Sequence, residues 1–494
     1  MTGPDGGFSS SATYFSGVVS FLDGPEAAAL EHGELEDRLQ VHSRELFRRL
    51  TQDHLDLRAR REQRVEVTDP EGTERRSVEK GHGRLLATVF GEVRVTRLAY
   101  RQKGLQNLHP ADGSLNLPIE RHSHGLRRLA ATEASRGAFE GAAEAITVAT
   151  GQHVGKRQVE ALARRAASDV EAFYEQRRAA DAESDAVLVL SCDGKGIVMR
   201  PDSLRDATKR AARASATKLK TRLSKGEKLG RKRMATVGAV YDVTPAPRTA
   251  ADVLVSGSEQ AVPSPVARNK WLTASVTDDA ARVVSKLFDQ AERRDPCHER
   301  TWIALVDGNN HQIDRIETEA ERRGLHLTIV VDLIHVLEYL WKAAWSFFDE
   351  GDSAAEAWVR DRAAAVLEGG ARDVAAGVRR RATHEHLTGA RREGADVCAA
   401  YLTNKTDYLN YPKALSSGWP IATGVIEGAC RHICKDRMDL TGARWGLDGA
   451  EAVLKLRTLR SNGDLDAYWR FHVSQERRRL HECRYAGSVI PSAA

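Results

Sequence analysis

The chain has 494 residues, of which 41% are hydrophobic and 29% charged, and its formal net charge is +5. This length is too great for one ordinary core and predicts about three structural units. No apolar stretch approaches the roughly 18 residues that cross a bilayer, which argues against a membrane protein. The apolar run at 14–22 is short and has no basic residue before it. A signal peptide is therefore not expected, and we predict a cytoplasmic protein.

Six cysteines are spread along the chain, which fits reduced thiols better than a disulfide framework. Cys430, His432 and Cys434 lie close together in the sequence. A single Cys-x-x-x-Cys pair without a second pair is a weak zinc signal. We therefore expect no structural zinc.

The N-terminal region divides into two predicted parts. Residues 1–33 are acidic, rich in Gly, Ser and Ala, and predicted to be disordered. Residues 34–115 begin with a charged helix and continue into two β-rich runs at 84–101, which flank Gly91-Glu92 and predict a hairpin. The stripe that this helix would bury consists of Leu39, Leu46, Leu50 and Leu55.

Residues 116–180 are predicted to be helical. An Ala-rich helix ends at Gly151 and a second, amphipathic helix starts near Lys156, which is the outline of a helix-turn-helix. In that case Lys156 and Arg157 would enter a DNA major groove. Two ordinary packed helices joined by a glycine cap give the same pattern, so both interpretations stay open.

Residues 181–350 have a different sequence pattern from the helical region before them. Apolar runs of strand length alternate with helical segments, which predicts an α/β sheet with buried strands. The runs lie at 186–192, 234–243, 302–306 and 325–331, and the helices at 278–294 and 312–323. A basic insertion at 205–233 holds twelve Lys or Arg and two acidic residues, which would attract phosphate backbones.

The remaining chain is predicted to be helical up to about residue 475 and to end in a tail. Residues 351–418 form a helical block, 419–475 contain a helix with Glu427 and further C-terminal helices, and 476–494 form a tail.

Acidic residues at the ends of strands suggest a catalytic site. Asp193 and Asp307 each follow an apolar run directly and precede a glycine, and ligands of open α/β sheets gather at the ends of strands. A single such Asp is more often a turn former. On the predicted helix, Glu427 has Arg431 and Lys435 at i+4 and i+8, which places the three on one face or forms an ordinary surface ion pair.

Three carboxylates on separate elements suit phosphoryl transfer. Cleaving a phosphodiester in line is helped by two cations about 3.5–4 Å apart, one on the attacking and one on the leaving oxygen. Magnesium prefers oxygen ligands and keeps several waters, so a few acidic side chains suffice to hold it.

Five stretches together carry a resemblance to a known family. They are FGEVRVTRLAYR at 90–101, SCDGKGI at 191–197, ALVDGNNHQI at 304–313, VVDLIHVLEYLW at 330–341 and GVIEGACRHICKDRMDLTGARW at 424–445. Over roughly residues 40–475 the chain resembles the ISKra group of insertion-sequence transposases, relatives of the Mutator-like DDE enzymes. The resemblance implies an α/β catalytic core with an RNase H-like mixed sheet and flanking helices. An all-helical insertion would interrupt this core, and a mainly helical DNA-binding region with the β-hairpin would precede it.

The resemblance also implies residue roles. Asp193, Asp307 and Glu427 would hold two Mg²⁺ or Mn²⁺ ions, and Asp332 and His335 would be accessory residues of a Cys/Asp-x-x-His signature. Asp332 also follows an apolar run, so it stays open as the second catalytic acid in place of Asp307. The expected DNA contacts are Lys156, Arg157, Lys195, Arg431, Lys435, Arg437 and Trp445, the last by stacking on an unpaired base. Core packing is the alternative for Trp445.

The function implied is cleavage and strand transfer of the ends of an insertion sequence. Double-stranded DNA would be the substrate and target, and at least a homodimer is expected because two ends must be joined. The protein would then be cytoplasmic and associated with the nucleoid. A nuclease of the same fold without strand transfer, or a non-catalytic DNA-binding relative, stays open.

Overall fold

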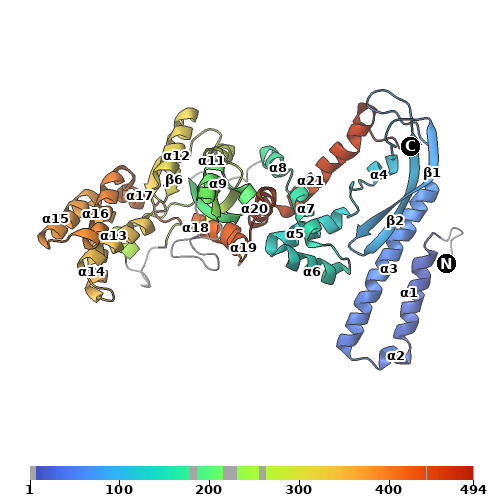
Figure 1. Cartoon of the computed structure of the whole chain (residues 1–494), viewed down its shortest axis with the longest axis horizontal. Coiled ribbons are helices and arrows are strands. Elements are labelled where there is room, and N and C mark those ends of the chain that lie inside the picture. The colour runs from blue at the N-terminus through green and yellow to red at the C-terminus, as the bar shows by residue number, and fades with distance from the viewer. Residues whose placement is uncertain (1–6, 178–185, 215–230, 255–262, 441, 493–494) are drawn as a thin grey trace. The chain divides into compact units, whose positions relative to one another are not determined.

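The computed structural model describes residues 7–177, 186–214, 231–254, 263–440 and 442–492. It contains two compact units, which are considered separately (Figure 1). Unit 1 consists of Met1–Gln176 and Gly463–Ala494, and unit 2 of Arg177–Asn462. The predicted mixture of helices and strands is confirmed: unit 1 has a two-stranded sheet and unit 2 a mixed five-stranded sheet. Among the described residues, no helix is both long and apolar enough to cross a membrane.

The described part of unit 1 begins with a helical hairpin, contrary to the expectation of disorder for residues 7–33, while residues 1–6 of that prediction lie outside the described residues. Helices α1 (Ser9–Leu22) and α2 (Pro25–Ala28) precede the long helix α3 (His32–Arg61). The backbone N–H of Ser11 donates a hydrogen bond to Asp53, and the Arg49 guanidinium lies 4.5 Å above the Tyr14 ring. Small residues suggested a solvated segment, but α1 gains its stability from this contact with α3.

The predicted β-hairpin is present and longer than expected. Strand β1 (Ser77–Thr88) pairs antiparallel with β2 (Gly91–Arg101). The chain reverses at residues 89–90, before Gly91, whose φ of 138° lies outside the range usual for other residues. Leu55 of α3 packs with this sheet, while the other three leucines of the predicted stripe are only half-buried.

The rest of unit 1 is helical. Its helices are α4 (Pro110–Ser114), α5 (His124–Arg136), α6 (Phe139–Thr150), α7 (Lys156–Ala166), α8 (Val170–Gln176) and α21 (Leu465–Leu480), followed by the 3₁₀ turns η4 (Glu482–Arg484) and η5 (Ala486–Ser488). Within the predicted tail at 476–494, residues 476–492 are described and are not a detached segment. Tyr485 is buried in a cluster with Leu98 and Tyr100.

In unit 2 the strand order is β5-β4-β3-β6-β7. The first three strands form an antiparallel meander, and β6 and β7 run parallel to β3. Their bounds are β3 Val187–Met199, β4 Arg231–Val243, β5 Ala267–Ser275, β6 Trp302–Val306 and β7 Thr328–Val331. Strand β5 was not predicted. Residues 231–233 belong to β4 and not to the basic insertion, of which 215–230 lie outside the described residues.

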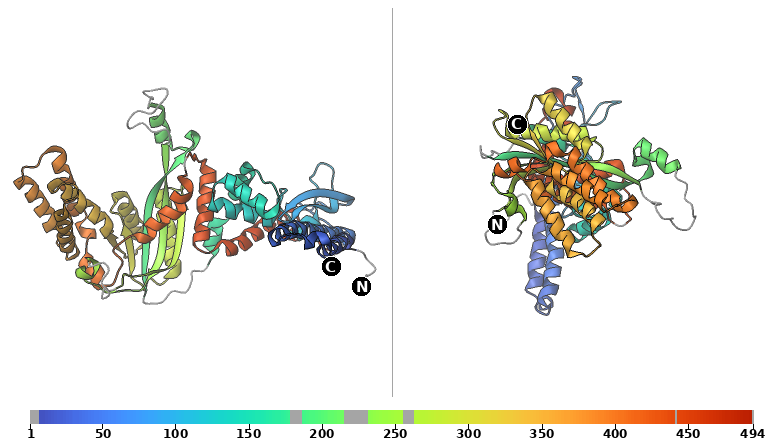
Figure 2. Two further views of the ribbon diagram at one scale, coloured as in Figure 1. Left: turned by 90° about the horizontal axis from the view of Figure 1, so that it is seen from below. Right: turned by 90° about the vertical axis from the view of Figure 1, so that its left-hand side faces the viewer.

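Helices flank this sheet and form a block beside it (Figure 2). Between the strands lie η1 (Pro201–Ser203), α9 (Asp206–Ala214), α10 (Ala250–Leu254), α11 (Ala280–Arg294) and α12 (Asn310–Arg323). Of these, α11 and α12 pack on the sheet, whereas α10 packs on the helical block described next. The block after β7 is α13 (Leu333–Phe347), α14 (Ser353–Leu367), α15 (Ala371–His384), α16 (Gly389–Asn404), η2 (Thr406–Tyr408) and α17 (Tyr411–Ser416). The chain then returns to the sheet through α18 (Gly424–Ala429), the π-helix η3 (Cys430–Lys435), α19 (Asp436–Met438) and α20 (Leu447–Ser461).

Candidate functional site

Asp193 does not follow its strand, as the sequence suggested, but lies within it. Strand β3 continues to Met199, and Asp193 pairs with Val237 of β4. Gly194 and Gly196, which follow Asp193, are both paired in the β3–β4 ladder. The long partner strand β4 holds this part of β3 extended, which local sequence alone does not show.

Three aspartates nevertheless fall in one row across β3, β6 and β7, at the level where β6 and β7 end. Strands β6 and β7 pair up to Val306 and Val331, so Asp307 and Asp332 occupy the next position in register. The β3–β6 register, continued by three residues, brings Asp193 opposite Asp307. Because adjacent strands lie about 4.8 Å apart, this row spans roughly 10 Å. Carboxylates in such a row can bind a cation, either alone or together with a phosphate group.

Asp332 is buried at the start of α13. Its carboxylate caps the helix by accepting a hydrogen bond of 2.8 Å from the Ile334 N–H. The second carboxylate oxygen accepts a hydrogen bond from the Thr423 hydroxyl and lies 3.3 Å from Nδ1 of His335. These contacts satisfy a carboxylate with no solvent exposure.

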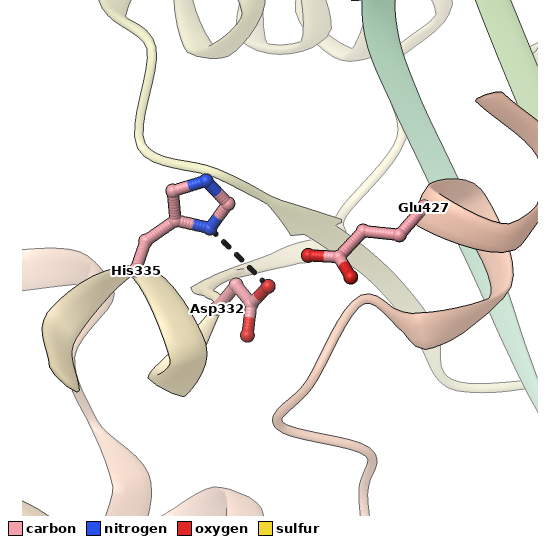
Figure 3. Close-up of side chains that lie close together, drawn as sticks. All are labelled: Asp332, His335 and Glu427. Atoms are coloured by element: carbon pink, nitrogen blue, oxygen red, sulfur yellow. Dashed lines mark hydrogen bonds and ion pairs between the residues drawn. The ribbon is translucent and has the colours of Figure 1, made fainter. Parts of the chain in front are cut away.

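Glu427 approaches Asp332 and His335 from α18 (Figure 3). In the part of the chain that the structure describes, these three residues form a group whose possible ligand atoms all lie within 4.8 Å of one another. His335 is half-buried and Glu427 exposed, so the group opens to solvent on one side. The hydrogen bond with Asp332 raises the pKa of His335 above its usual value. The arrangement could hold one metal ion.

The group differs from the triad that the sequence predicted. Glu427 lies with Asp332 and His335, whereas Asp193 and Asp307 are outside this 4.8 Å group. Asp332 and His335 were expected as accessory residues, with Asp332 left open as the second catalytic acid. Their spacing on the first turn of a helix was the signal that they share one side, since residues three apart on a helix are neighbours.

Asp193 has a thiol neighbour that the sequence analysis did not foresee. Its carboxylate accepts a hydrogen bond from Cys430, with Sγ and Oδ2 3.3 Å apart. Burial and the negative charge of Asp193 hold the pKa of Cys430 well above its usual range. Burial also raises the pKa of Cys434 to about 12. Both thiols are therefore protonated at neutral pH, and Cys430 acts here as a donor.

Asp307 lies where the helical block meets the sheet. Its carboxylate accepts a hydrogen bond from the Asn309 N–H, and its carbonyl oxygen accepts one of 3.1 Å from the Tyr401 hydroxyl. Gly308 has a φ of +88°, and a Cβ there would lie 2.6 Å from the Tyr401 hydroxyl oxygen. Glycine is thus required for both its backbone angle and the close approach of Tyr401.

The helix that carries Glu427 is not the regular α-helix that was assumed. The segment Cys430–Lys435 is a π-helix, in which hydrogen bonds run from i to i+5. A π-helical turn is wider than an α-helical turn, so the offsets of Arg431 and Lys435 from Glu427 around the helix axis differ from those of a regular α-helix, and their placement on one face stays a prediction. All three side chains are exposed. Lys195 of β3 is half-buried, and its charge acts on Cys430 and Cys434.

Two of the expected DNA contacts are buried. Arg437 and Trp445 are 2% and 5% exposed, and the guanidinium lies 4.6 Å above the indole ring. The indole N–H donates to the carbonyl of Met438, and the backbone N–H of Trp445 donates to Val198. Trp445 is thus a packing residue that extends the β3 edge, which corrects the prediction that it stacks on a base.

In unit 1, Lys156 and Arg157 are exposed at the start of α7. Gly151 ends α6 in the left-handed conformation, with a φ of 69°. The Gly155 N–H donates to the Gln158 side chain, which caps the next helix. This geometry has the outline of a helix-turn-helix and leaves both basic side chains accessible.

Neither a scan against models of protein families nor a search of curated proteins returned a match to this chain.

Proposed function

We propose that this chain is a DDE-type DNA transposase, which cleaves DNA strands at the ends of an insertion sequence and transfers them to a target. The observation that carries the proposal is the row formed by Asp193 within β3, Asp307 directly after β6 and Asp332 directly after β7, with Glu427 brought close to Asp332 by α18. The strand order, an antiparallel meander continued by two parallel strands, is compatible with an RNase H-like core interrupted by the helical block α13–α17.

The residues present fit divalent cations. Carboxylate oxygens suit Mg²⁺ and Mn²⁺, and the imidazole of His335 favours Mn²⁺ over Mg²⁺. Asp193, Asp307 and Glu427 would hold two ions, with Asp332 and His335 beside them. The bound ions would supply stabilisation of the attacking and leaving oxygens during in-line displacement at phosphorus.

The protein's own side chains would bind and orient DNA. The thiol of Cys430 holds one oxygen of Asp193, and Tyr401 holds the backbone of Asp307, so both acids are positioned before substrate arrives. Lys195, Arg431 and Lys435 would neutralise phosphates near the site, and α9 would add further positive charge. Lys156 and Arg157 of unit 1 would contact double-stranded DNA. A homodimer or larger assembly would join the two ends.

The test uses a duplex with a free 3′-hydroxyl end and a supercoiled target, in Mg²⁺ or Mn²⁺. The terminal repeats that flank the gene supply the duplex sequence. Joined products support a transposase, whereas nicked target without joining supports the nuclease alternative. DNA binding with neither product supports a non-catalytic relative.

Single substitutions test which acidic residues are needed as metal ligands. Asp193→Asn, Asp307→Asn and Glu427→Gln should each reduce joining by about 10³-fold or more, as expected for loss of a metal ligand. Glu356→Gln, an exposed carboxylate on α14, is the matched control and should leave joining unchanged. If Asp307→Asn retains full cleavage while Asp332→Asn loses it, Asp332 is the second catalytic acid and the assignment of Asp307 is wrong.

A further inference from the structure

Helix α1 has three distinct faces. Ser11, Tyr14 and Phe21 lie toward α3: Ser11 bonds Asp53, and Tyr14 and Phe21 contact His42. A second face is small, polar and exposed, formed by Ser9, Thr13, Ser16, Gly17 and Ser20. The third face is apolar and also exposed, formed by Ala12, Phe15, Val19 and Leu22 together with Phe8, the residue directly before the helix. This third face is called the α1 seam below.

The spacing of the α1 seam is that of a helix-packing surface. Its residues are separated by four, three, four and three positions, the 3.5-residue repeat that keeps apolar side chains on the line of contact between two helices. Phe15 and Val19 at its centre are 55% and 47% exposed. An apolar stripe of this regularity, left open to water, indicates a missing helical partner.

The charged residues near the α1 seam indicate which kind of partner it could bind. Residues 7–22 contain no charged side chain, and the next charges in the sequence, Asp23 and Glu26, are acidic. The Arg49 guanidinium lies above Tyr14, on the face that packs on α3, and Glu26 pairs with Arg38. Nucleic-acid binding relies on Lys and Arg, and the seam itself carries neither. An anionic membrane surface is disfavoured for the same reason, because interfacial helices carry basic residues on their polar face. The seam fits an uncharged helix with the same 3.5-residue repeat.

We propose that this partner is the α1 seam of a second copy of the chain, packed antiparallel about Phe15. A two-fold interface requires a self-complementary surface. Helix α3, which runs beside α1, has exposed acids at its start (Glu34, Glu36, Asp37) and exposed arginines at its end (Arg58, Arg60, Arg61). The antiparallel arrangement places the acidic start of one α3 toward the basic end of the other.

The interface is small, so the dimer is weak. A seam on a helix of 14 residues is about 21 Å long and lies at the low end of specific interfaces. We expect a monomer–dimer equilibrium at micromolar concentrations, which exists without DNA or metal. The inference therefore does not rest on the proposed function.

The mass of the protein in the absence of DNA tests the proposed dimer. In sedimentation equilibrium from about 1 to 100 μM, the full chain should shift from monomer to dimer mass. The double variant Phe15→Glu/Val19→Glu should remain monomeric over this range, because it places like charges at the centre of the seam. Ser16→Glu/Ser20→Glu adds the same charge on the polar face of the same helix and should dimerise as the unmodified chain does.

Circular dichroism checks that both double variants fold, which is expected because all four positions are exposed. A monomer at every concentration overturns the proposal. Unchanged dimerisation of Phe15→Glu/Val19→Glu also overturns it.

Cross-linking tests the orientation. In a background of Cys297→Ser/Cys483→Ser, which removes the two exposed cysteines, copies with Phe8→Cys are mixed with copies with Leu22→Cys. Disulfides between the two kinds of copy support the antiparallel seam. Disulfides formed only between copies of one kind overturn it.

Discussion

Asp332 shows how a single buried carboxylate can organise its surroundings. It caps α13, accepts a hydrogen bond from Thr423 at the start of α18, and contacts His335. It thus joins the end of β7, the helical block and the helix with Glu427. A residue with this many polar contacts and no solvent exposure is costly to remove, because each donor that it satisfies would lose its partner.

The first prediction concerns the pKa of His335. Its hydrogen bond to Asp332 raises this pKa, so the pair stabilises the fold below the unfolded histidine pKa and loses this contribution as pH rises through the folded value. Asp332→Asn keeps a capping oxygen but removes the negative charge, and the pKa of His335 should fall. An NMR titration of the imidazole in metal-free protein measures it.

The matched control is Asp352→Asn, the same substitution at the cap of α14. It should leave the pKa of His335 unchanged. An unaltered pKa in Asp332→Asn would show that the hydrogen bond is not its cause.

The second prediction concerns Gly308. Gly308→Ala should destabilise the protein by about 1–3 kcal/mol, because it combines a positive φ with a clash against the Tyr401 hydroxyl. In a Tyr401→Phe background the nearest atom would lie 3.3 Å from the new Cβ, so the cost of Gly308→Ala should be smaller. Chemical denaturation of the four proteins in this double-mutant cycle measures the difference. Equal costs in both backgrounds would contradict the role of the hydroxyl.

At the scale of elements, α21 is held to unit 1 by a buried charge network. Glu476 of α21 bonds Arg127 of α5 at 2.7 Å, and His472 and Arg479 both bond Asp169, just before α8. Arg127 and His472 have no solvent exposure. Buried charges that satisfy one another in this way specify a single packing of the three helices, since any other would leave a charge unpaired.

The third prediction follows from this network. Burial alone would raise the pKa of Asp169, but the hydrogen bonds from His472 and Arg479 hold it below its usual range. Its contribution to stability is therefore present above the unfolded pKa of about 3.9 and is lost as pH falls through the folded value. Asp169→Asn should lower the stability of unit 1 at pH 7 by about 2–3 kcal/mol and weaken its dependence on acidic pH.

Thermal unfolding at pH 7 and at lower pH measures this effect. Asp466→Asn, on α21 and in an exposed pair with Arg128, should change stability by less than about 0.5 kcal/mol. Equal effects of the two substitutions would mean that the buried network contributes no more than a surface ion pair.

At the scale of the whole molecule, the chain leaves unit 1 after α8 and returns to it at α21. Unit 2 is therefore continuous in sequence, whereas unit 1 is made of two segments. The side chain of Asn462 bonds both the N–H and the carbonyl of Leu272, so the last residue of unit 2 closes the edge strand β5. The residue that bonds the edge strand of the unit 2 sheet therefore belongs to unit 2 itself.

The fourth prediction is that a fragment of residues 177–462 folds alone and unfolds cooperatively, as a domain with its own core does. A fragment of residues 1–176 lacks α21 and leaves Arg127 and Asp169 without their partners, so it should melt below unit 1 of the full chain. Joining residues 463–494 to it through a flexible linker should restore the melting temperature. Scanning calorimetry measures these transitions, and absence of a cooperative transition in 177–462 would contradict the division into units.

The sequence by itself determined the elements whose signal is local. Strand β6 has the predicted bounds, and α11, α12 and the hairpin β1–β2 lie close to theirs, because periodicity and turn residues are properties of one segment. Only the tertiary structure decided that Asp332 lies with Glu427, that β3 runs on through Asp193, and that Trp445 is buried. Each of these depends on strand pairing or helix packing between segments far apart in the chain, which no local pattern encodes.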